Sequence, residues 1–261
     1  MMNRILAIFS VSFKKNIRDR TVYIVFAMSF LFILVGRGCT PEIKNIDGSS
    51  GLPFDPQAIA MQIAFHVIVI LTLALSSLLS MNAFTREFDH GTLLISLVRP
   101  ISRSLYAAGK FLSVFVISVL NLFLLGIIFF IMFYIKTGVM NFSIFPSFAF
   151  IVLNLALVII MGLFFSFFIP RTAVPLLNLF IYLMSIFTEI PYYFKSESTP
   201  SATTAFLNTV LPDFGELHFK CASLLSGNGS YADCLWPSFT IILYSAACWF
   251  LLVFIFKKRD I

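Results

Sequence analysis

"TREFDHGTLLISLVRPISRSLYAAGK", residues 85–110, is the longest polar-rich interruption in the first half of a strongly apolar chain. A connection between two packed helices needs only about 2–8 residues, so this stretch is far longer than a hairpin requires. It also keeps a series of charged or ionisable side chains, which are Arg86, Glu87, Asp89, His90, Arg99, Arg103 and Lys110. Its length and composition indicate a structured element rather than a simple turn.

The composition places most of the chain in a membrane. The chain has 261 residues, of which 59% are hydrophobic and 11% are charged, and 33 of them are Phe. Soluble domains usually carry about 25% charged residues. The net charge of +6 does not indicate a nucleic-acid partner, because the basic residues lie at the ends of apolar stretches. We therefore expect an all-α polytopic membrane protein.

Six apolar stretches are long enough, or nearly so, to cross a hydrocarbon core about 30 Å thick. They are residues 21–36, 57–84, 109–135, 145–169, 172–191 and 235–256. The break between the fourth and the fifth rests on Pro170 and Arg171 alone. The alternative is one long kinked helix at this point and five spans in total.

The distribution of Lys and Arg predicts the orientation. Thirteen of the 18 basic residues lie at the N-terminus, in residues 85–110, at Arg171 and at the C-terminus, and the other five lie in the remaining connections. Because basic residues are enriched on the cytoplasmic side, we expect a multi-pass protein of the cytoplasmic (inner) membrane with both termini in the cytoplasm.

Residues 1–20 predict an amphipathic helix that precedes the transmembrane domain of residues 21–261. Apolar residues follow one stripe at helical spacing and basic residues lie opposite, namely Met2, Ile5, Leu6, Phe9, Phe13 and Ile17 against Arg4, Lys14, Lys15 and Arg18. Such a helix lies in the headgroup plane with its cations toward anionic lipid, so membrane lipid is an expected partner. The alternative is a basic tail that only sets the topology.

Residues 191–234 form a long segment on the expected outer side. Within it, TAFLNTVLPDFGELHFKCASLLSG (residues 204–227) has enough helical spacing for one or two short helices packed into the outer mouth of the bundle. A disulfide between Cys221 and Cys234 would close the segment in an oxidising compartment, and free buried thiols are the alternative. Together with Cys39 and His218 these cysteines match no zinc spacing, so we expect no metal site.

Two ionisable residues lie within the predicted spans, His66 in the second and Glu189 near the outer end of the fifth. Ionisable groups inside a membrane are candidates for function. His66 and Glu189, with the amides of Asn121 and Asn178, are therefore our candidates for a substrate path. Glu189 is alternatively an interfacial carboxylate, and the amides, with that of Asn154, alternatively join helices by hydrogen bonds worth about 1 kcal/mol or less each.

The sequence contains no phosphate-binding loop, HExxH, GxSxG or dinucleotide fingerprint. Gly109 and Lys110 lack the upstream glycine of a phosphate-binding loop, because Ser104 stands there, and Phe111 follows them. We therefore expect a chain with no catalytic residues that is not an enzyme by itself and binds no cofactor.

Residues 92–97 of the quoted stretch predict a short helix that lies across the membrane surface. Thr92 is placed to cap it, and Arg99 and Pro100 stop it, because the residue before a proline disfavours helical geometry. Ser102 is placed to cap the next helix, which leads into the third span. The apolar side chains at residues 93–95, 97 and 98 need a partner surface.

The same stretch resembles type-2 ABC-transporter permeases, whose pattern is E-x-x-x-G-T-L-x-x-L-x-x-R-P-[IV]-S-R followed by G-K. The matching residues are Glu87, Gly91, Thr92, Leu93, Arg99, Pro100, Ser102, Arg103, Gly109 and Lys110. The predicted N-terminal helix, six spans, internal termini and long outer segment are similar to that family over the whole chain. LPDFGELHFK (residues 211–220) also resembles the outer segment of the branch that serves nitrous-oxide-reductase maturation and gliding motility.

In that family two permeases form the membrane core, and two separate ABC ATPase subunits bind below them and hold ATP and Mg²⁺. The resemblance implies a homodimer of this chain and a cytoplasmic coupling helix within residues 85–104. The implied coupling residues are Arg86, Glu87, Gly91, Thr92, Leu93, Leu94, Leu97, Arg99 and Pro100. The first two would meet polar groups of the ATPase, the leucines would fill its groove, and the Arg-Pro turn would fix the angle.

Three functions stay open at this point. The resemblance favours a permease that couples ATP hydrolysis by separate subunits to export of a substrate. The second is an ATP-driven assembly or mechanotransmission subunit that acts on a periplasmic partner protein, as in metal-centre maturation. The third is a lone secondary carrier or an intramembrane enzyme, which the few charges within the spans and the missing motifs disfavour.

Overall fold

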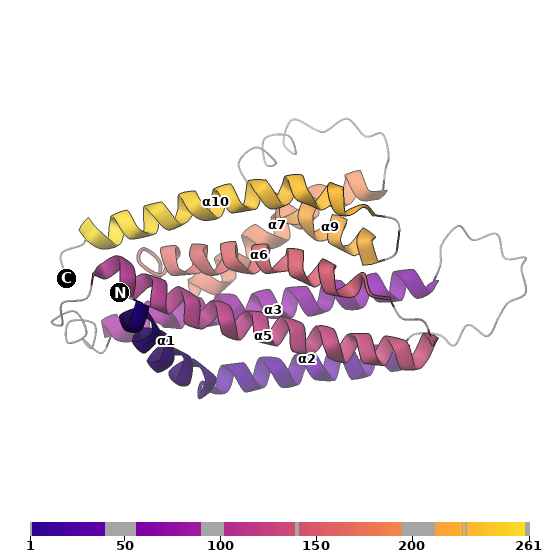
Figure 1. The fold of residues 1–261 in the computed structure, drawn as a ribbon, viewed down its shortest axis with the longest axis horizontal. Coiled ribbons are helices and arrows are strands. Elements are labelled where there is room, and N and C mark those ends of the chain that lie inside the picture. Colours follow the sequence, from indigo (N-terminus) through magenta and orange to yellow (C-terminus); the bar gives the residue numbers. More distant parts are fainter. Residues whose placement is uncertain are drawn as a thin grey trace, which may run out of the picture.

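The computed structural model describes residues 2–39, 56–89, 102–138, 141–194, 212–225, 227 and 229–258. Within these residues the regular structure is helical, and no strand occurs in them. Figure 1 shows most of the helices running lengthwise beside one another as a bundle. The expected all-α fold is confirmed.

The helices are, in chain order, α1 (Met2–Ile17), α2 (Arg20–Cys39), α3 (Pro56–Asp89), α5 (Arg103–Thr137), α6 (Ile144–Phe165), α7 (Ala173–Phe194), α9 (Phe214–Leu225) and α10 (Tyr231–Lys258). The longest are α3 and α5, with 34 and 35 residues. At about 1.5 Å per residue each is about 50 Å long, which exceeds a hydrocarbon core of about 30 Å. Both helices are therefore long enough to extend beyond a membrane.

Within the part of the chain that the structure describes, five helices are long and apolar enough to cross a membrane. Their apolar parts are Met61–Ala83, Arg103–Ile135, Ile144–Phe165, Ala173–Ile190 and Tyr231–Phe256, with mean hydropathy from 1.7 to 2.9. This is the pattern of a multi-pass helical membrane protein. In α2 the apolar part with described side chains, Val22–Leu31, is shorter than a span, although the helix itself has 20 residues.

The predicted break near Pro170 is confirmed, and the alternative of one long kinked helix is wrong. α6 ends at Phe165, four residues before the predicted end, and α7 begins at Ala173. A proline has no N–H for a helical hydrogen bond and disfavours helical geometry in the preceding residue. The carbonyl of Pro170 instead accepts a hydrogen bond from the N–H of Ala173 at 2.9 Å, which closes a turn.

The fifth span ends later, and the sixth begins earlier, than the sequence predicts. α7 continues past Pro191 to Phe194, and α10 begins at Tyr231 instead of residue 235. α10 starts early because Ser230 and Asp233 form a capping box. The N–H of Ser230 donates to Oδ2 of Asp233 at 3.2 Å, and Oγ of Ser230 accepts from the N–H of Ala232 at 3.3 Å.

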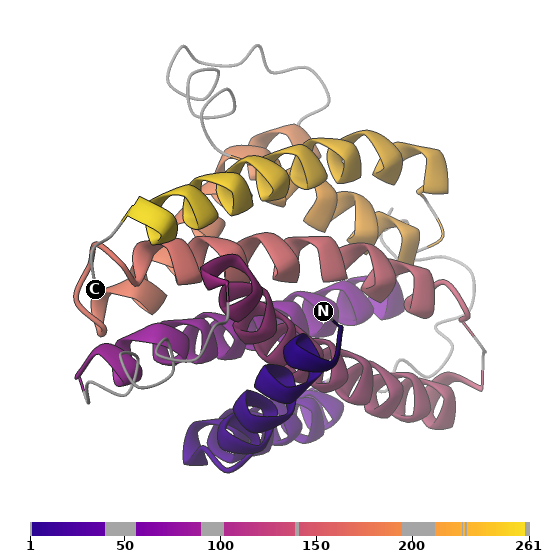
Figure 2. The same ribbon diagram turned by 60° about the vertical axis from the view of Figure 1, so that its left-hand side comes forward.

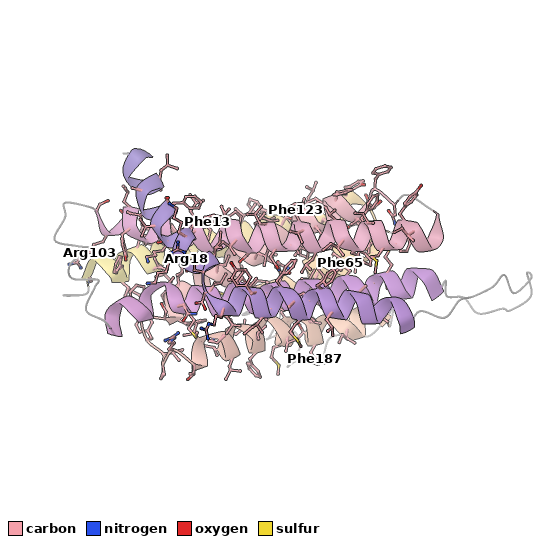
Figure 3. The ribbon with its side chains drawn as sticks, turned by 90° about the horizontal axis from the view of Figure 1, so that it is seen from below. Phe13, Arg18, Phe65, Arg103, Phe123 and Phe187 are labelled. Carbon is pink, nitrogen blue, oxygen red and sulfur yellow. The ribbon has the colours of Figure 1, made fainter. Side chains whose placement is uncertain are left out.

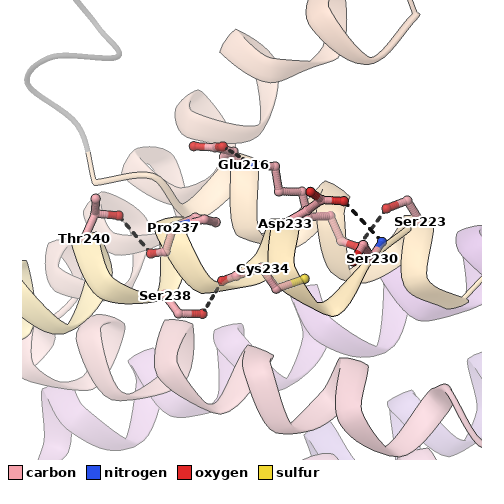
Figure 4. Close-up of polar contacts among 9 residues, drawn as sticks. Glu216, Ser223, Ser230, Asp233, Cys234, Pro237, Ser238 and Thr240 are labelled. Atoms are coloured by element: carbon pink, nitrogen blue, oxygen red, sulfur yellow. Dashed lines mark hydrogen bonds and ion pairs between the residues drawn. The ribbon is translucent and has the colours of Figure 1, made fainter. Parts of the chain in front are cut away.

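Proline is tolerated inside α10 at Pro237. A proline within a helix removes one backbone hydrogen bond, and hydroxyl side chains nearby commonly compensate inside membranes. Around Pro237, Oγ of Ser238 donates to the carbonyl of Cys234 at 2.6 Å, and Oγ1 of Thr240 donates to the carbonyl of Pro237 at 2.8 Å (Figure 4). Neither hydroxyl bonds the carbonyl of Asp233, which loses its helical partner, and α10 nevertheless continues to Lys258.

The helix predicted over residues 1–20 is observed as α1, which lies across the start of α5 (Figure 2). Gly109 permits the close approach, because a Cβ built there would lie 2.7 Å from Cγ2 and 2.9 Å from Cβ of Ile8. Nδ2 of Asn16 also donates to Oγ of Ser113 at 3.4 Å. α1 is thus part of the folded bundle, while its place at a membrane surface stays a prediction.

Several helix ends lie together at one end of the bundle, namely the end of α3, the start of α5 and the end of α10, with α1 nearby (Figure 1). Figure 3 shows Arg18 and Arg103 near this end, whereas Phe65 lies farther along the bundle. Nη1 of Arg103 donates to the carbonyl of Phe256 at 3.1 Å, which ties the start of α5 to the end of α10. We call this end the terminal end.

Two clusters of buried apolar side chains fill the bundle. One lies toward the terminal end and includes Leu79, Leu163 and Phe256. The other includes Phe65 and Phe214 and combines buried residues of α9 with residues of α3, α5, α6, α7 and α10. One face of α9 is therefore packed into the half of the bundle remote from the terminal end.

Candidate functional site

Hydrogen-bonded polar side chains cross the half of the bundle that holds α9. His66 of α3 and His218 of α9 meet through their ring nitrogens Nδ1 and Nε2, respectively. The ring centroids lie 4.6 Å apart and the ring planes are inclined by 20°, so the two rings meet edge to edge through these nitrogens. The hydroxyl of Tyr182 on α7 lies 2.7 Å from Nδ1 of His218. Both ring nitrogens of His218 are thus engaged by other polar side chains.

Asn154 of α6 continues this series of contacts. Nδ2 of Asn154 donates to the carbonyl of Phe214 at 3.4 Å, and the ring of Phe214 packs against the ring of Tyr182 with centroids 5.4 Å apart. We call His66, His218, Tyr182 and Asn154 the histidine chain. It joins α3, α9, α7 and α6, and all of its members except the half-buried His66 are at most 1% exposed.

The sequence of α9 explains why His218 points inward. Buried residues recur along one stripe at helical spacing, namely Phe214, Gly215, Leu217, His218, Cys221, Ala222, Leu224 and Leu225. On the opposite side Glu216 and Lys220, four residues apart, form an ion pair. His218 therefore belongs to the apolar stripe, where a polar ring has to find a hydrogen-bond partner within the protein.

The first turn of α9 is anchored to α7. The N–H of Gly215 donates to Oγ of Ser185 at 2.9 Å, and the same Oγ donates to the carbonyl of Pro212 at 3.0 Å. A Cβ built at Gly215 would overlap the carbonyl of Ser185 and lie 2.9 Å from Cγ of Glu189. Glycine therefore permits the close contact that seats α9 against α7.

Burial makes the charged form of His218 unfavourable. Desolvation lowers the pKa of His218 well below its ordinary value of 6.5, and the adjacent His66 lowers it further. The groups at its two ring nitrogens are another imidazole and the phenol of Tyr182, and a phenol is neutral at pH 7. The site is therefore a buried polar cluster held together by neutral hydrogen bonds.

The candidates for a substrate path do not converge on one site. His66 belongs to the histidine chain, and Glu189 lies half-buried beside the first turn of α9. Asn121 of α5 instead donates through Nδ2 to Oγ1 of Thr72 on α3 at 3.2 Å. Because the hydroxyl of Thr72 itself donates to a carbonyl one turn earlier, it is free to accept this bond.

Asn178 of α7 makes a separate set of contacts. Its Nδ2 donates to Oγ of Ser77 on α3 at 3.1 Å and to the carbonyl of Val158 on α6 at 3.3 Å. Its side chain is 3% exposed. The structure thus shows Asn121 and Asn178 as residues that join helices, at positions distinct from the histidine chain.

Cys221 of α9 and Cys234 of α10 lie next to one another. Both are buried free thiols, and their side chains are hydrogen-bonded. This hydrogen bond and burial raise the pKa of the Cys221 thiol well above its usual value. The structure therefore has the free-thiol state, and the disulfide stays a prediction. Within the described residues, no group of three or more His, Cys, Asp or Glu residues could hold a metal ion.

Most of the expected coupling residues lie outside the described residues, as does the predicted helix over residues 92–97. They are Gly91, Thr92, Leu93, Leu94, Leu97, Arg99 and Pro100. Arg86 and Glu87 belong to the last turns of α3, and the structure describes their backbone. Ser102 occupies the N-cap position of α5 as predicted, although its side chain makes no capping hydrogen bond.

The sequence predicts His66 as a site residue but not its partners His218 and Tyr182. A usable signal was present at His218, which stands three and seven residues before Cys221 and Leu225 on an apolar helical stripe. An imidazole at such a position indicates a buried partner. Tyr182 carries no comparable signal, because a tyrosine in an apolar span commonly serves packing alone.

Comparison with protein families extends over nearly the whole chain. Residues 5–261 match the model of a family described as "Protein of unknown function (DUF2705)". No curated protein matches the chain. The matched residues include the histidine chain and the candidate spans. The chain belongs to the DUF2705 family.

Proposed function

We propose that the chain is the membrane-spanning subunit of an ATP-driven exporter of the type-2 ABC class, in which separate ATPase subunits hydrolyse ATP. The observation that carries this proposal is the motif within residues 86–110, which matches the coupling stretch of that class in both its charged and its apolar positions. The motif begins in the last turns of α3 and ends in the first turns of α5, which are the longest helices described.

The proposed topology has six spans, with α2 as the first. Its 20 residues correspond to about 30 Å at 1.5 Å per residue, which is enough for one crossing. The bias of basic residues toward the terminal end supports a cytoplasmic location of that end. In this orientation α9 and the histidine chain lie in the outer half of the membrane protein.

The proposed mechanism uses α3 and α5 as levers. The segment between them would receive the movement of the ATPase subunits, which bind ATP and Mg²⁺. Arg103 ties the start of α5 to the carbonyl of Phe256 on α10, and Gly109 seats α1 on α5 through Ile8. A displacement of this segment would therefore pass directly to two further helices, α10 and α1, as in rigid-body coupling between packed elements.

The proposed assembly is a homodimer of this chain with two ABC ATPase subunits. Interactions made by the ATPase would involve the charged Arg86 and Glu87 and the leucines at residues 93, 94 and 97. The partner subunits would supply the nucleotide chemistry, since the sequence of this chain has no phosphate-binding loop.

Co-purification tests this proposal. The tagged chain is expressed together with the ABC-type ATPase expected to be encoded beside it and is extracted in mild detergent. We expect a stable complex whose ATP hydrolysis requires the phosphate-binding loop of the ATPase. A chain that forms no such complex, or that transports by itself after reconstitution, would contradict the proposal. Capture of an outer protein by residues 191–234 would instead favour an assembly role.

A further inference from the structure

The inner face of α9 is held by several neighbours at once. It packs against α7, α6, α10 and α3, and His218 lies near the middle of this face. The outer face carries the ion pair of Glu216 and Lys220. An amphipathic helix held in this way has two alternatives, docked in the bundle or released from it, and the ionisation of its buried groups decides the balance.

The hydrogen bonds of the histidine pair limit how many protons it can hold while α9 is docked. A neutral imidazole has one donor and one acceptor nitrogen, whereas a protonated imidazole has two donors. If His218 takes up one proton, it can donate from Nε2 to Nδ1 of His66 and from Nδ1 to the oxygen of Tyr182. If His66 is protonated as well, two N–H groups face each other across the contact.

The docked pair therefore has room for one added proton at most, whereas the two separated histidines can each take one. We propose that His66 and His218 form a proton-binding site, and that loading it with protons from the compartment that α9 faces releases α9 from the bundle. This inference goes beyond the proposed exporter function and does not require the ATPase.

The burial of His218 determines that acid, and not base, favours the release of α9. Its ring is 1% exposed, and desolvation followed by the charge of His66 lowers its pKa in the docked state. A released histidine returns to an ordinary pKa of about 6.5. Docking is therefore at full strength above pH 6.5 and weakens as the pH falls below this value, because the released state binds more protons.

Other titratable groups lie on the elements that pack around His218. On α3 the facing group is His66, and on α7 they are Tyr182 and Glu189. On α10 they are Asp233 and Cys234, and α9 itself contributes Cys221, Glu216 and Lys220. α6 contributes the neutral amide of Asn154. The acidic groups with described partners lie away from the His218 ring, since Glu216 pairs with Lys220 and Asp233 caps α10 at Ser230.

Asp213, directly before α9, has the opposite influence on how the docking of α9 depends on pH. Its burial raises the pKa of its carboxyl, so the docked state binds this proton more tightly than the released state does. Acid therefore strengthens docking through Asp213 and weakens it through the histidines. Release of α9 in acid would therefore occur against the contribution of Asp213.

Hydrogen–deuterium exchange of the full chain in lipid nanodiscs tests the proposal. The amides of α9 are followed at pH 7.5 and at pH 5.5, about one unit on either side of the ordinary histidine pKa, with correction for intrinsic exchange rates. We expect the protection of α9 to fall about 10-fold to 100-fold at the lower pH, for one or two protons taken up on release. In His218→Gln, which stays neutral, this fall should disappear where one proton was taken up and should shrink to about 10-fold where two were.

Asp213→Asn is the matched control, because it removes a titratable group next to α9 and should keep the fall. If His218→Gln does not fold, His66→Gln provides the test from α3. Where release takes up two protons, His66→Gln should make the fall in α9 protection about 10-fold smaller, and where release takes up one proton, it should abolish the fall. Unchanged protection of α9 in the wild-type chain, or an equal fall in the folded histidine variants, would overturn the proposal.

Discussion

Ser80 of α3 occupies the space that a side chain at Gly162 of α6 would need. A Cβ built at Gly162 would overlap Oγ of Ser80, and it would lie 2.9 Å from Cβ of Ser80 and 2.8 Å from Nδ2 of Asn178. Ser80 and Asn178 come from the helices on either side of α6, so three helices meet where residue 162 has no side chain. Small residues commonly allow membrane helices to approach closely in this way.

Gly162→Ala should therefore destabilise the bundle. Because the overlap involves Cβ of Ser80 as well as its rotatable hydroxyl, the helices must separate, at a cost of about 1–3 kcal/mol for overpacking. The unfolding temperature of the purified chain in detergent reports this loss. Ser80→Ala should relieve part of it in the double variant, and equal destabilisation with and without Ser80→Ala would contradict the assigned contact.

Gly109→Leu should displace α1 from α5. A side chain at this position would enter the space filled by Ile8, whose Cβ lies 2.9 Å from the position of a built Cβ. Ser12, which is 4% exposed on α1, offers a reporter after Ser12→Cys. We expect faster labelling of this cysteine by a maleimide in the Gly109→Leu background than in the Ser12→Cys chain alone.

Gly109→Ala combined with Ile8→Gly is the matched control for α1. Glycine at position 8 has neither the Cγ2 nor the Cβ that the built Cβ would meet, so labelling at position 12 should stay slow. Fast labelling in this control, or slow labelling in Gly109→Leu, would show that α1 is not seated at Gly109.

Tyr182→Phe should weaken the docking of α9 at neutral pH. The substitution keeps the buried ring but leaves Nδ1 of His218 without its phenol partner, and an unsatisfied buried polar group costs about 1–3 kcal/mol. Thermal unfolding and amide exchange of α9 should both register the change. Tyr244→Phe, on the half-buried part of α10, provides a control whose effect should be small.

Arg103→Gln should loosen the last turn of α10. The guanidinium donates to the carbonyl of Phe256 at 3.1 Å, and a cation near the C-terminus of a helix also interacts favourably with its dipole, by about 0.3–1 kcal/mol. We expect faster amide exchange at the end of α10 with little change in α9. Equal amide exchange in the wild-type chain and in Arg103→Gln would show that Arg103 does not link α5 to α10.

The helices were largely predictable from hydropathy, whereas their ends depended on details that hydropathy does not carry. Pro170 broke the chain between α6 and α7, but Pro191 and Pro237 did not break their helices. A proline terminates a membrane helix or is absorbed by it according to the groups that satisfy the freed backbone around it. The capping box of Ser230 and Asp233, by contrast, is a local signal that the sequence displays.

The histidine chain was predictable only at one position. His66 stands out because ionisable residues are rare in membrane spans. His218 is 152 residues away in sequence, and only the packing of α9 inside the bundle brings the two rings together. The sequence of the outer segment predicts a short helix. The place where this helix docks depends on the contact between Gly215 and Ser185, which is known only when α7 and α9 are both placed.

The central claim is that residues 86–110 couple this chain to a separate ATPase, and Leu94→Asp tests it most directly. A charge at residue 94 would disrupt an apolar contact with the ATPase while leaving the apolar spans unchanged. In nanodiscs that contain this chain and the ATPase, we expect the wild-type chain to bind the ATPase and change its rate of ATP hydrolysis, and Leu94→Asp to lose both effects while its unfolding temperature is unchanged. Binding and hydrolysis in the Leu94→Asp complex equal to those of the wild type would contradict the account.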